Sequence, residues 1–250
     1  WMSEGRRQMQ NASMVGLSRQ VARAREMDVV ANNIANLNTT GYKADGSVFE
    51  EYLSSAARAD MTGTRISFVQ DRGTWHNLSQ GAAEHTGNPL DVAIDGPGFL
   101  VVQTPQGDRY TRNGSMQINA TGQLVTSDGY TVLGDGGPIT LQPNDRQIQI
   151  SRDGTISVRE GTSNVDSTRG KIRLVDFANP ERLQKVGNGT FNPVGGAQPQ
   201  PAATTSGLIQ GSIEQSNVHG VVEMSRMIEI TRAYTQIDSL LQQQNDISQS

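Results

Sequence analysis

Apolar side chains near the start of the chain follow a helical repeat. They recur every three or four positions at Met14, Leu17, Val21, Ala24, Met27, Val30, Ile34 and Leu37. This spacing predicts an α-helix with one apolar stripe. Asn11 or Ser13 is expected to cap its start by accepting hydrogen bonds from free amides. The run 38–41 is expected to end it, since Gly41 tolerates a left-handed backbone. Residues 1–10 are excluded from the prediction, because Trp1 before Met2 is not an ordinary chain start.

The end of the chain repeats the same pattern. Met224, Met227, Ile230, Tyr234, Ile237 and Leu241 are again three or four positions apart. No proline follows Pro201 and no glycine follows Gly220, so nothing interrupts the repeat. The spacing predicts a second long helix from about Val218 to Ile247.

Between these segments, turn signals such as Asn113-Gly114 and Asp153-Gly154 recur every few residues, separated by short runs rich in β-branched side chains. This pattern predicts β-strands. We therefore expect an α+β fold with three regions. Residues 11–41 and 215–250 form a terminal helical assembly domain, paired as a coiled coil or bundle. Residues 42–75 and 178–214 form extended links, and residues 76–177 form a central all-β domain.

The apolar stripes of the two helices need a partner. Burial is worth about 25 cal/mol per Å², so each large apolar side chain gains one or two kcal/mol when it leaves water. The long polar stretches beside the β region favour pairing of the two helices with each other. Small residues such as Ser18, Ala22 and Ala31 would let helices of other subunits approach closely. The alternative is that both helices cover the β domain as part of its core.

Composition excludes several classes of function. The net charge of −4 and the pI of about 5.4 argue against a nucleic-acid partner. No run is long and apolar enough to predict a membrane span. The chain has no cysteine, which rules out disulfides and thiolate metal sites.

Candidate catalytic chemistry is weak. His76, His85 and His219 lack the spacing of a helical zinc site. The glycines at 134–137 favour a tight hairpin over a calcium turn. Asp91 and Asp95 could be a glycosidase pair only if the fold set their separation suitably. We therefore expect no enzyme activity, no cofactor and no metal. The alternative from another class is a secreted β-rich protein that binds or hydrolyses carbohydrate, although Trp75 is the only internal tryptophan.

Three blocks of sequence carry a family resemblance. Residues 31–36 (ANNIAN) and 39–43 (TTGYK) resemble the N-terminal signature of bacterial flagellar rod and hook proteins. Residues 86–99, 110–114 and 122–126 are similar to the β domain of that family, and residues 216–218, 223–224 and 232–234 to its C-terminal region. Chain length and residues 68–80 resemble the proximal rod members most, with distal rod and hook members as alternatives.

The resemblance implies a structural subunit of the basal-body rod in the periplasm, exported unfolded by the flagellar type III apparatus. It also implies assembly with copies of itself and with other rod proteins into a tube that transmits torque, with the terminal helices inside. The predicted assembly interface comprises Leu17, Val21, Met27, Val30, Asn32, Asn33, Ile34, Asn36, Leu37, Met224, Met227, Ile230, Tyr234, Ile237 and Leu241.

The asparagines of the signature have a physical interpretation of their own. Amides buried between helices must be hydrogen-bonded, so Asn32, Asn33 and Asn36 could fix the register of packed helices at some cost in stability. The alternative is that they face solvent or help to end the helix.

Overall fold

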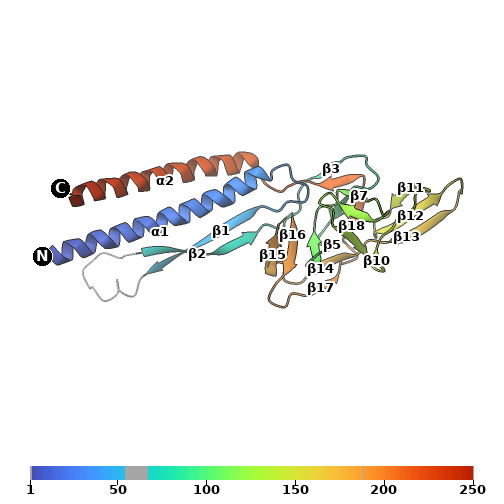
Figure 1. The fold of residues 1–250 in the computed structure, drawn as a ribbon, viewed down its shortest axis with the longest axis horizontal. Helices are drawn as coiled ribbons and strands as arrows, with labels where there is room; N and C mark the ends of the chain where they lie inside the picture. Colours follow the sequence, from blue (N-terminus) through green and yellow to red (C-terminus); the bar gives the residue numbers. More distant parts are fainter. Residues whose placement is uncertain (1, 54–66, 188, 250) are drawn as a thin grey trace. The chain divides into compact units, whose positions relative to one another are not determined.

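The computed structural model describes residues 2–53, 67–187 and 189–249. The chain divides into two compact units (Figure 1). Unit 1 is formed within residues 1–35, 45–77 and 218–250, and unit 2 within residues 36–44 and 78–217. The fold is mixed, with a β-rich region between two terminal helices, as the sequence predicts.

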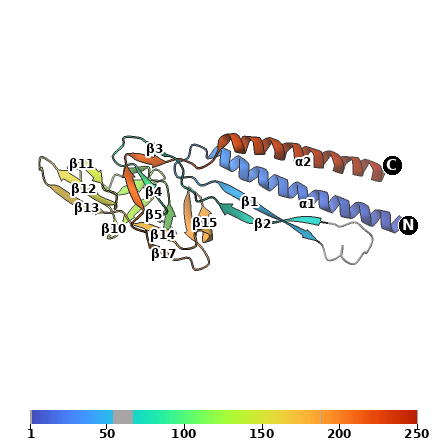
Figure 2. The same cartoon turned by 180° about the vertical axis from the view of Figure 1, so that it is seen from behind.

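Unit 1 contains both helices, α1 (Met2–Ala35) and α2 (Gly220–Gln249). They run antiparallel and side by side (Figures 1 and 2). Helix α1 starts well before Asn11 and Ser13, so the predicted caps are wrong. Residues 2–13 contain no proline and include good helix formers such as glutamine, arginine and methionine, which carry the helix through Gly5 despite the cost of that residue. The predicted stop is confirmed, because α1 ends at Ala35 and Gly41 has a φ of 68°.

The other part of unit 1 is a hairpin beside α1. Strands β1 (Asp45–Leu53) and β2 (Ser67–His76) pair antiparallel, with a register shift between Val48 and Phe49. Both strands contact α1. Residues 45–75, which we expected to be an extended link, therefore form a paired ribbon packed on a helix. Gly46 lets the indole of Trp75 lie close to the backbone of β1, because a Cβ at position 46 would stand 2.4 Å from the indole nitrogen.

Unit 2 is built from short antiparallel strands. Its described residues include β5 (Phe99–Thr104), β6 (Gly107–Thr111), β7 (Met116–Ile118), β8 (Leu124–Thr126), β9 (Thr131–Gly134), β10 (Gly137–Pro138), β14 (Leu174–Phe177), β15 (Leu183–Val186), β16 (Thr190–Pro193) and β17 (Pro199–Pro201). These ten strands form one sheet with the order β15-β16-β6-β5-β9-β8-β7, to which β10, β14 and β17 are attached.

Three smaller sheets complete unit 2. They are β11 (Asp145–Ile150), β12 (Thr155–Glu160) and β13 (Asp166–Lys171); β4 (Val92–Asp95) with β18 (Gly207–Gln210); and β3 (Ala83–His85) with β19 (Ser212–Glu214). A 3-10 turn, η2 (Pro180–Arg182), precedes β15.

Two apolar clusters hold these sheets together. The larger includes Ile94, Leu100, Leu124 and Ile156, each at most 1% exposed. The smaller is rich in aromatic rings and comprises Phe99, Val101, Tyr110, Leu133, Val175, Phe177, Leu183 and Phe191. Its rings meet edge to face, with Tyr110 and Phe177 centroids 4.8 Å apart. Neither cluster contains a residue of α1 or α2, which argues against the alternative that the helices are part of the β core.

Residues 178–214 also differ from the extended link that we expected. They form β15 to β19. Four of these strands pair with strands that come earlier in unit 2, β16 with β6, β17 with β14, β18 with β4 and β19 with β3. Leu183, Phe191 and Leu208 from this stretch are buried in the two clusters. The stretch therefore closes unit 2.

The ion pair of Arg169 with Asp145 on the three-stranded sheet predicts how the stability of unit 2 depends on pH. Arg169 donates two hydrogen bonds, of 2.8 and 2.6 Å, to the buried carboxylate of Asp145, and these bonds lower the pKa of Asp145. Because the folded pKa is lowered, the stabilisation is present above the unfolded pKa of 3.8 and is lost as the pH falls through the lowered value. We expect Arg169→Gln to cost roughly 1–3 kcal/mol at neutral pH and to move acid unfolding to higher pH, as followed by circular dichroism.

The control is Arg159→Gln, because the pair of Arg159 with Asp166 is exposed and should contribute little. An acid transition at the same pH in Arg169→Gln and the unchanged protein would contradict the prediction.

Candidate functional site

Helices α1 and α2 bury one face of each against their surroundings in unit 1. Val30 is 1% exposed and Ile230 is 2% exposed, and Gln20 donates a 3.0 Å hydrogen bond to the hydroxyl of Tyr234. The partly buried members of the predicted interface are Met27, Ile34, Asn36, Leu37, Met227, Tyr234 and Ile237, of which Asn36 and Leu37 belong to unit 2. Only part of the predicted stripe is therefore buried by contacts within the chain.

The remaining apolar members face water. Leu17, Val21 and Met224 are 57%, 47% and 53% exposed, and the side chain of Leu241 lies outside the described residues. The physical reason is the step size. A helix turns about 100° per residue, so every three-residue step falls about 60° short of a full turn and the stripe winds around the helix. One stripe in the sequence thus contributes to two faces of the structure.

Helix α2 also exposes apolar residues that the sequence analysis missed. Val221, Val222, Ile228 and Leu240 are 81%, 58%, 54% and 61% exposed. Val221, Met224 and Ile228 are three and four positions apart, so they share a face that is turned away from Ile230. We call these three residues the outer stripe. The spacing of the outer stripe can be read from the sequence. Residues 224, 227 and 230 form an equally regular repeat, however, and the prediction placed the apolar face of the helix on their side.

Asn33 is the buried amide of the signature. It is fully buried, and its Nδ2 donates to the carbonyl oxygen of Asp45 at 2.8 Å and to the carboxylate of Glu223 in α2 at 3.2 Å. Its Oδ1 accepts a 2.9 Å bond from the amide of Asp45. Asn32 is exposed, and Asn36 accepts a 3.1 Å bond from the Thr39 hydroxyl in the turn after α1. Asn33 thus joins α1, α2 and the first residue of β1.

We expect Asn33→Ala to destabilise unit 1 by about 1–3 kcal/mol, because it leaves the Asp45 backbone groups without their buried partner. Assembly should weaken, while unit 2 keeps its fold. Hydrogen exchange of peptides from both units measures the two effects separately. Asn32→Ala is the matched control, since Asn32 is exposed and its bond to the Asp45 carboxylate is 3.5 Å long. Equal protection of unit 1 in the two variants would refute the role of Asn33.

A buried ionic cluster in unit 2 was not predicted. Glu214 accepts a 2.5 Å bond from Lys43 Nζ and a 2.7 Å bond from Arg112 Nε, and all three side chains are at most 3% exposed. The other guanidinium nitrogens of Arg112 donate to backbone carbonyls of Ile94, Gly96 and Gly98. Burial lowers the pKa of Lys43, and the charge of Glu214 opposes that shift. One carboxylate therefore balances two buried cations.

Backbone contacts surround this cluster. The amide of Gly41 donates to the Glu214 carbonyl at 2.7 Å, and the amide of Ala44 donates to the side chain of Asn217 at 2.7 Å. Tyr42 is buried with Lys185 Nζ 3.4 Å from its ring centroid, a cation–π contact. A side chain at position 41 would meet backbone atoms of Arg112 at 2.5 Å, so the site needs glycine. The TGYK part of the signature thus has a structural role inside the subunit.

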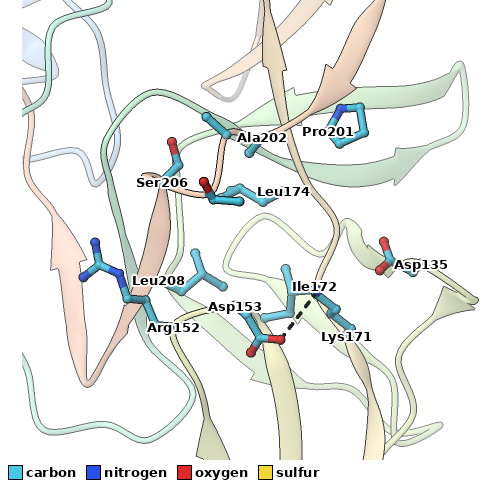
Figure 3. Close-up of a pocket in the computed structure, with 12 residues that line it drawn as sticks. Asp135, Arg152, Asp153, Lys171, Ile172, Leu174, Pro201, Ala202, Ser206 and Leu208 are labelled. Carbon is cyan, nitrogen blue, oxygen red and sulfur yellow. Dashed lines mark ion pairs between the residues drawn. The ribbon is translucent and has the colours of Figure 1, made fainter.

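A shallow pocket of about 390 Å³ lies in unit 2 (Figure 3). Buried Ile172 and Leu208 form part of its lining, and exposed charged side chains stand around them. Three of these charges are already paired, Lys171 with Asp153 at 3.5 Å and Arg152 with Asp95 at 2.7 Å. Hydrogen bonds from Ser151 and Thr155 lower the pKa of Asp153. This arrangement offers no activated acid, base or nucleophile.

In the described ranges, no group of three or more His, Cys, Asp or Glu side chains could hold a metal ion. None of the described helices has the length and hydropathy needed to cross a membrane.

Comparison with known proteins gives three family matches. Residues 14–43 match the flagella basal body rod protein family, residues 93–158 the D1 domain of the flagellar hook protein FlgE/F/G, and residues 209–250 the C-terminal region of flagellar basal body rod FlgEFG proteins. The first match contains Asn33 and Lys43, and the third contains Glu214 and the outer stripe.

Curated relatives cover nearly the whole chain. The flagellar basal-body rod protein FlgF of Caulobacter vibrioides is 38% identical over 97% of this chain and 96% of its own length. FlgF of Mesorhizobium japonicum is 34% identical over 94% and 93%. The flagellar basal-body rod protein FlgG of Bacillus subtilis is 34% identical over 90% and 91%.

Proposed function

This chain belongs to the family of bacterial flagellar basal-body rod proteins, and from this premise we propose that its terminal helices assemble with those of neighbouring subunits into a tube. The chain is a structural subunit of the basal-body rod, located in the periplasmic space, and is not an enzyme. The carbohydrate-binding alternative is thereby set aside.

The observation that carries the proposal is the exposed apolar surface on both helices. Leu17 and Val21 on α1, and the outer stripe on α2, face away from the residues buried inside unit 1. Covering one such side chain is worth about 1–2 kcal/mol, at about 25 cal/mol per Å². Helices of adjacent copies, or of other rod proteins, are the partners that the family supports.

We also propose that α1 and α2 of one chain pair as an antiparallel coiled coil within this wall. The buried Val30 and Ile230, the bond from Gln20 to Tyr234 and the bond from Asn33 to Glu223 support this pairing. Apolar contacts supply the energy, and the buried amide supplies the register. The predicted interface residues would then divide between the pair and its neighbours.

Within the family, we propose a FlgF-like position in the proximal rod, supported by FlgF relatives of 38% and 34% identity. A distal position is the second candidate, since FlgG relatives reach 35%. We extend the proposal to export of the unfolded chain by the flagellar type III apparatus and to transmission of torque by the finished rod. The lack of cysteine suits such export, because no disulfide can trap the chain.

Cysteine cross-linking in cells tests the proposal. The chain has no cysteine, so Val21→Cys and Met224→Cys place unique thiols on the exposed faces of α1 and α2. We expect a short bifunctional thiol reagent to join the two variants, expressed together, into covalent dimers in isolated basal bodies. Ala120→Cys, in an exposed turn of unit 2, is the control. Monomers alone from the helical variants would overturn the proposal.

A further inference from the structure

The chain passes between its two units at four peptide links, between residues 35 and 36, 44 and 45, 77 and 78, and 217 and 218. On the unit 2 side, these four links lead into three segments, because residues 36–44 carry a link at each end. Each segment has residues in the ionic cluster of Lys43, Arg112 and Glu214 or bonded to it. We call residues 41–44, 79–82 and 214–217, together with Arg112, the clamp.

Direct hydrogen bonds join the three segments of the clamp to one another. The carbonyl of Ser79 accepts from Lys43 Nζ at 2.6 Å and from Asn217 Nδ2 at 3.0 Å. The side-chain oxygen of Asn217 accepts from the Ala44 amide at 2.7 Å, so Asn217 touches both other segments.

Glu214 adds a second set of connections between the same segments. Besides Lys43, its carboxylate accepts a 2.8 Å bond from the amide of Gly81. The amide of Gln215 donates to the carbonyl of Ala82 at 2.8 Å. Each of the three segments is thus bonded to the other two.

Arg112 anchors the clamp to the main sheet. It follows the last residue of β6, bonds Glu214 through Nε, and reaches the carbonyls of Gly96 and Gly98 with its other nitrogens. Since β5 begins at Phe99, these carbonyls lead directly into the core strands. Force applied to one clamp segment is therefore transmitted to the other two segments and, through Arg112, to the main sheet.

We propose that the clamp is the mechanical junction through which unit 2 receives force along the chain from the terminal helices. This rests on the proposed function only in that a rod subunit works under torque. Bonds that are stretched together resist force better than bonds that break one after another. We expect the hydrogen bonds of the clamp to be stretched together, because the four links lead into three segments that are hydrogen-bonded to one another.

Force spectroscopy of the isolated chain in optical tweezers tests the proposal without requiring assembly. Handles on the two chain ends apply force to unit 2 at residues 36 and 217. Asn217→Ala removes connections between the segments and leaves the ionic cluster intact. We expect its unit 2 to unfold roughly tenfold faster at a given force along this axis, the factor that corresponds to about 1 kcal/mol from the lost hydrogen bonds of Asn217. Glu214→Gln should accelerate unfolding further, roughly 10²-fold.

A second pulling axis separates a mechanical role from general stabilisation. Ala120→Cys and Asn164→Cys are exposed in unit 2 outside the clamp, and the chain offers no other thiol for attachment. Along this axis, Asn217→Ala should unfold at the force of the parent chain. If Asn217→Ala accelerates unfolding equally along both axes, or along neither, the clamp has no special mechanical role and the proposal fails. Should Asn217→Ala fold poorly, Asn217→Asp is judged by the same two outcomes, because it keeps the acceptor for the Ala44 amide and loses the bond to the Ser79 carbonyl.

Discussion

Replacing Glu214 by glutamine is expected to lower the free energy of unfolding of unit 2 by about 3–5 kcal/mol, the range for breaking a buried ion pair from one side. Arg112 would keep its charge without a counterion in a site that is at most 3% exposed, and the pKa of Lys43, which burial already lowers, would fall further without the charge of Glu214. The new amide side chain could still accept hydrogen bonds through its oxygen, so the loss reports the missing negative charge. Besides residue 214, Arg112 would still donate to backbone carbonyls such as that of Gly98, whereas Lys43 would still donate to the carbonyl of Ser79.

Hydrogen exchange of unit 2 peptides in increasing urea measures this effect apart from changes in the helices. The matched control is Asp166→Asn, which removes one carboxylate from the exposed pair with Arg159 and should change stability by about 0.5 kcal/mol or less. A loss in Glu214→Gln no larger than in this control would show that the cluster does not stabilise unit 2 through its charge.

The second large effect is expected at the outer stripe. Ile228→Asp should abolish rod assembly and swimming, because a carboxylate buried between helices costs several kcal/mol without a partner. The isolated subunit should fold normally, since Ile228 is 54% exposed within the chain. Motility in soft agar, electron microscopy of basal bodies and the helical content of the purified chain are the three measurements.

Gln236→Asp is the control for this substitution. It places the same charge on an exposed position of α2 outside the outer stripe. Wild-type swimming of Ile228→Asp would mean that this face stays in water in the rod. Loss of swimming in both variants would mean that added charge anywhere on α2 is harmful, and that the stripe is not special.

The sequence was a good guide to elements with a long, regular period. Both helices and the β character of the middle region follow from spacing alone, because periodicity is a local property. The start of α1 was missed because residues 2–13 have no apolar repeat, although they do not oppose a helix. Strands β15 to β19 were missed for a related reason. They are three or four residues long, and the two prolines in β17 are unusual for a strand. Apart from the local pair of β15 with β16, the strands β16, β18 and β19 pair with strands far away in the chain.

The candidate site was predicted less completely than the fold. The stripe identified the right helices but did not reveal that Leu17 and Val30 lie on different faces, since a straight helix rotates the stripe. The ionic cluster has no local pattern at all. Lys43 and Arg112 each occur in a motif typical of the family, but their common partner is 171 and 102 positions further along. The meeting of three lone charges is a property of the tertiary fold.

The pairing of β19 with β3 and of β18 with β4 has a consequence for the time at which unit 2 can fold. During synthesis the chain emerges from its N-terminus. The cations at 43 and 112 and the strands that await partners are therefore made well before residues 207–214. Contacts this distant in sequence form slowly, since a large loop must close first. A growing chain that has not reached Glu214 thus has an unfinished β unit whose buried cations lack their counterion, and unit 2 can be completed only after residues 207–214 have been made.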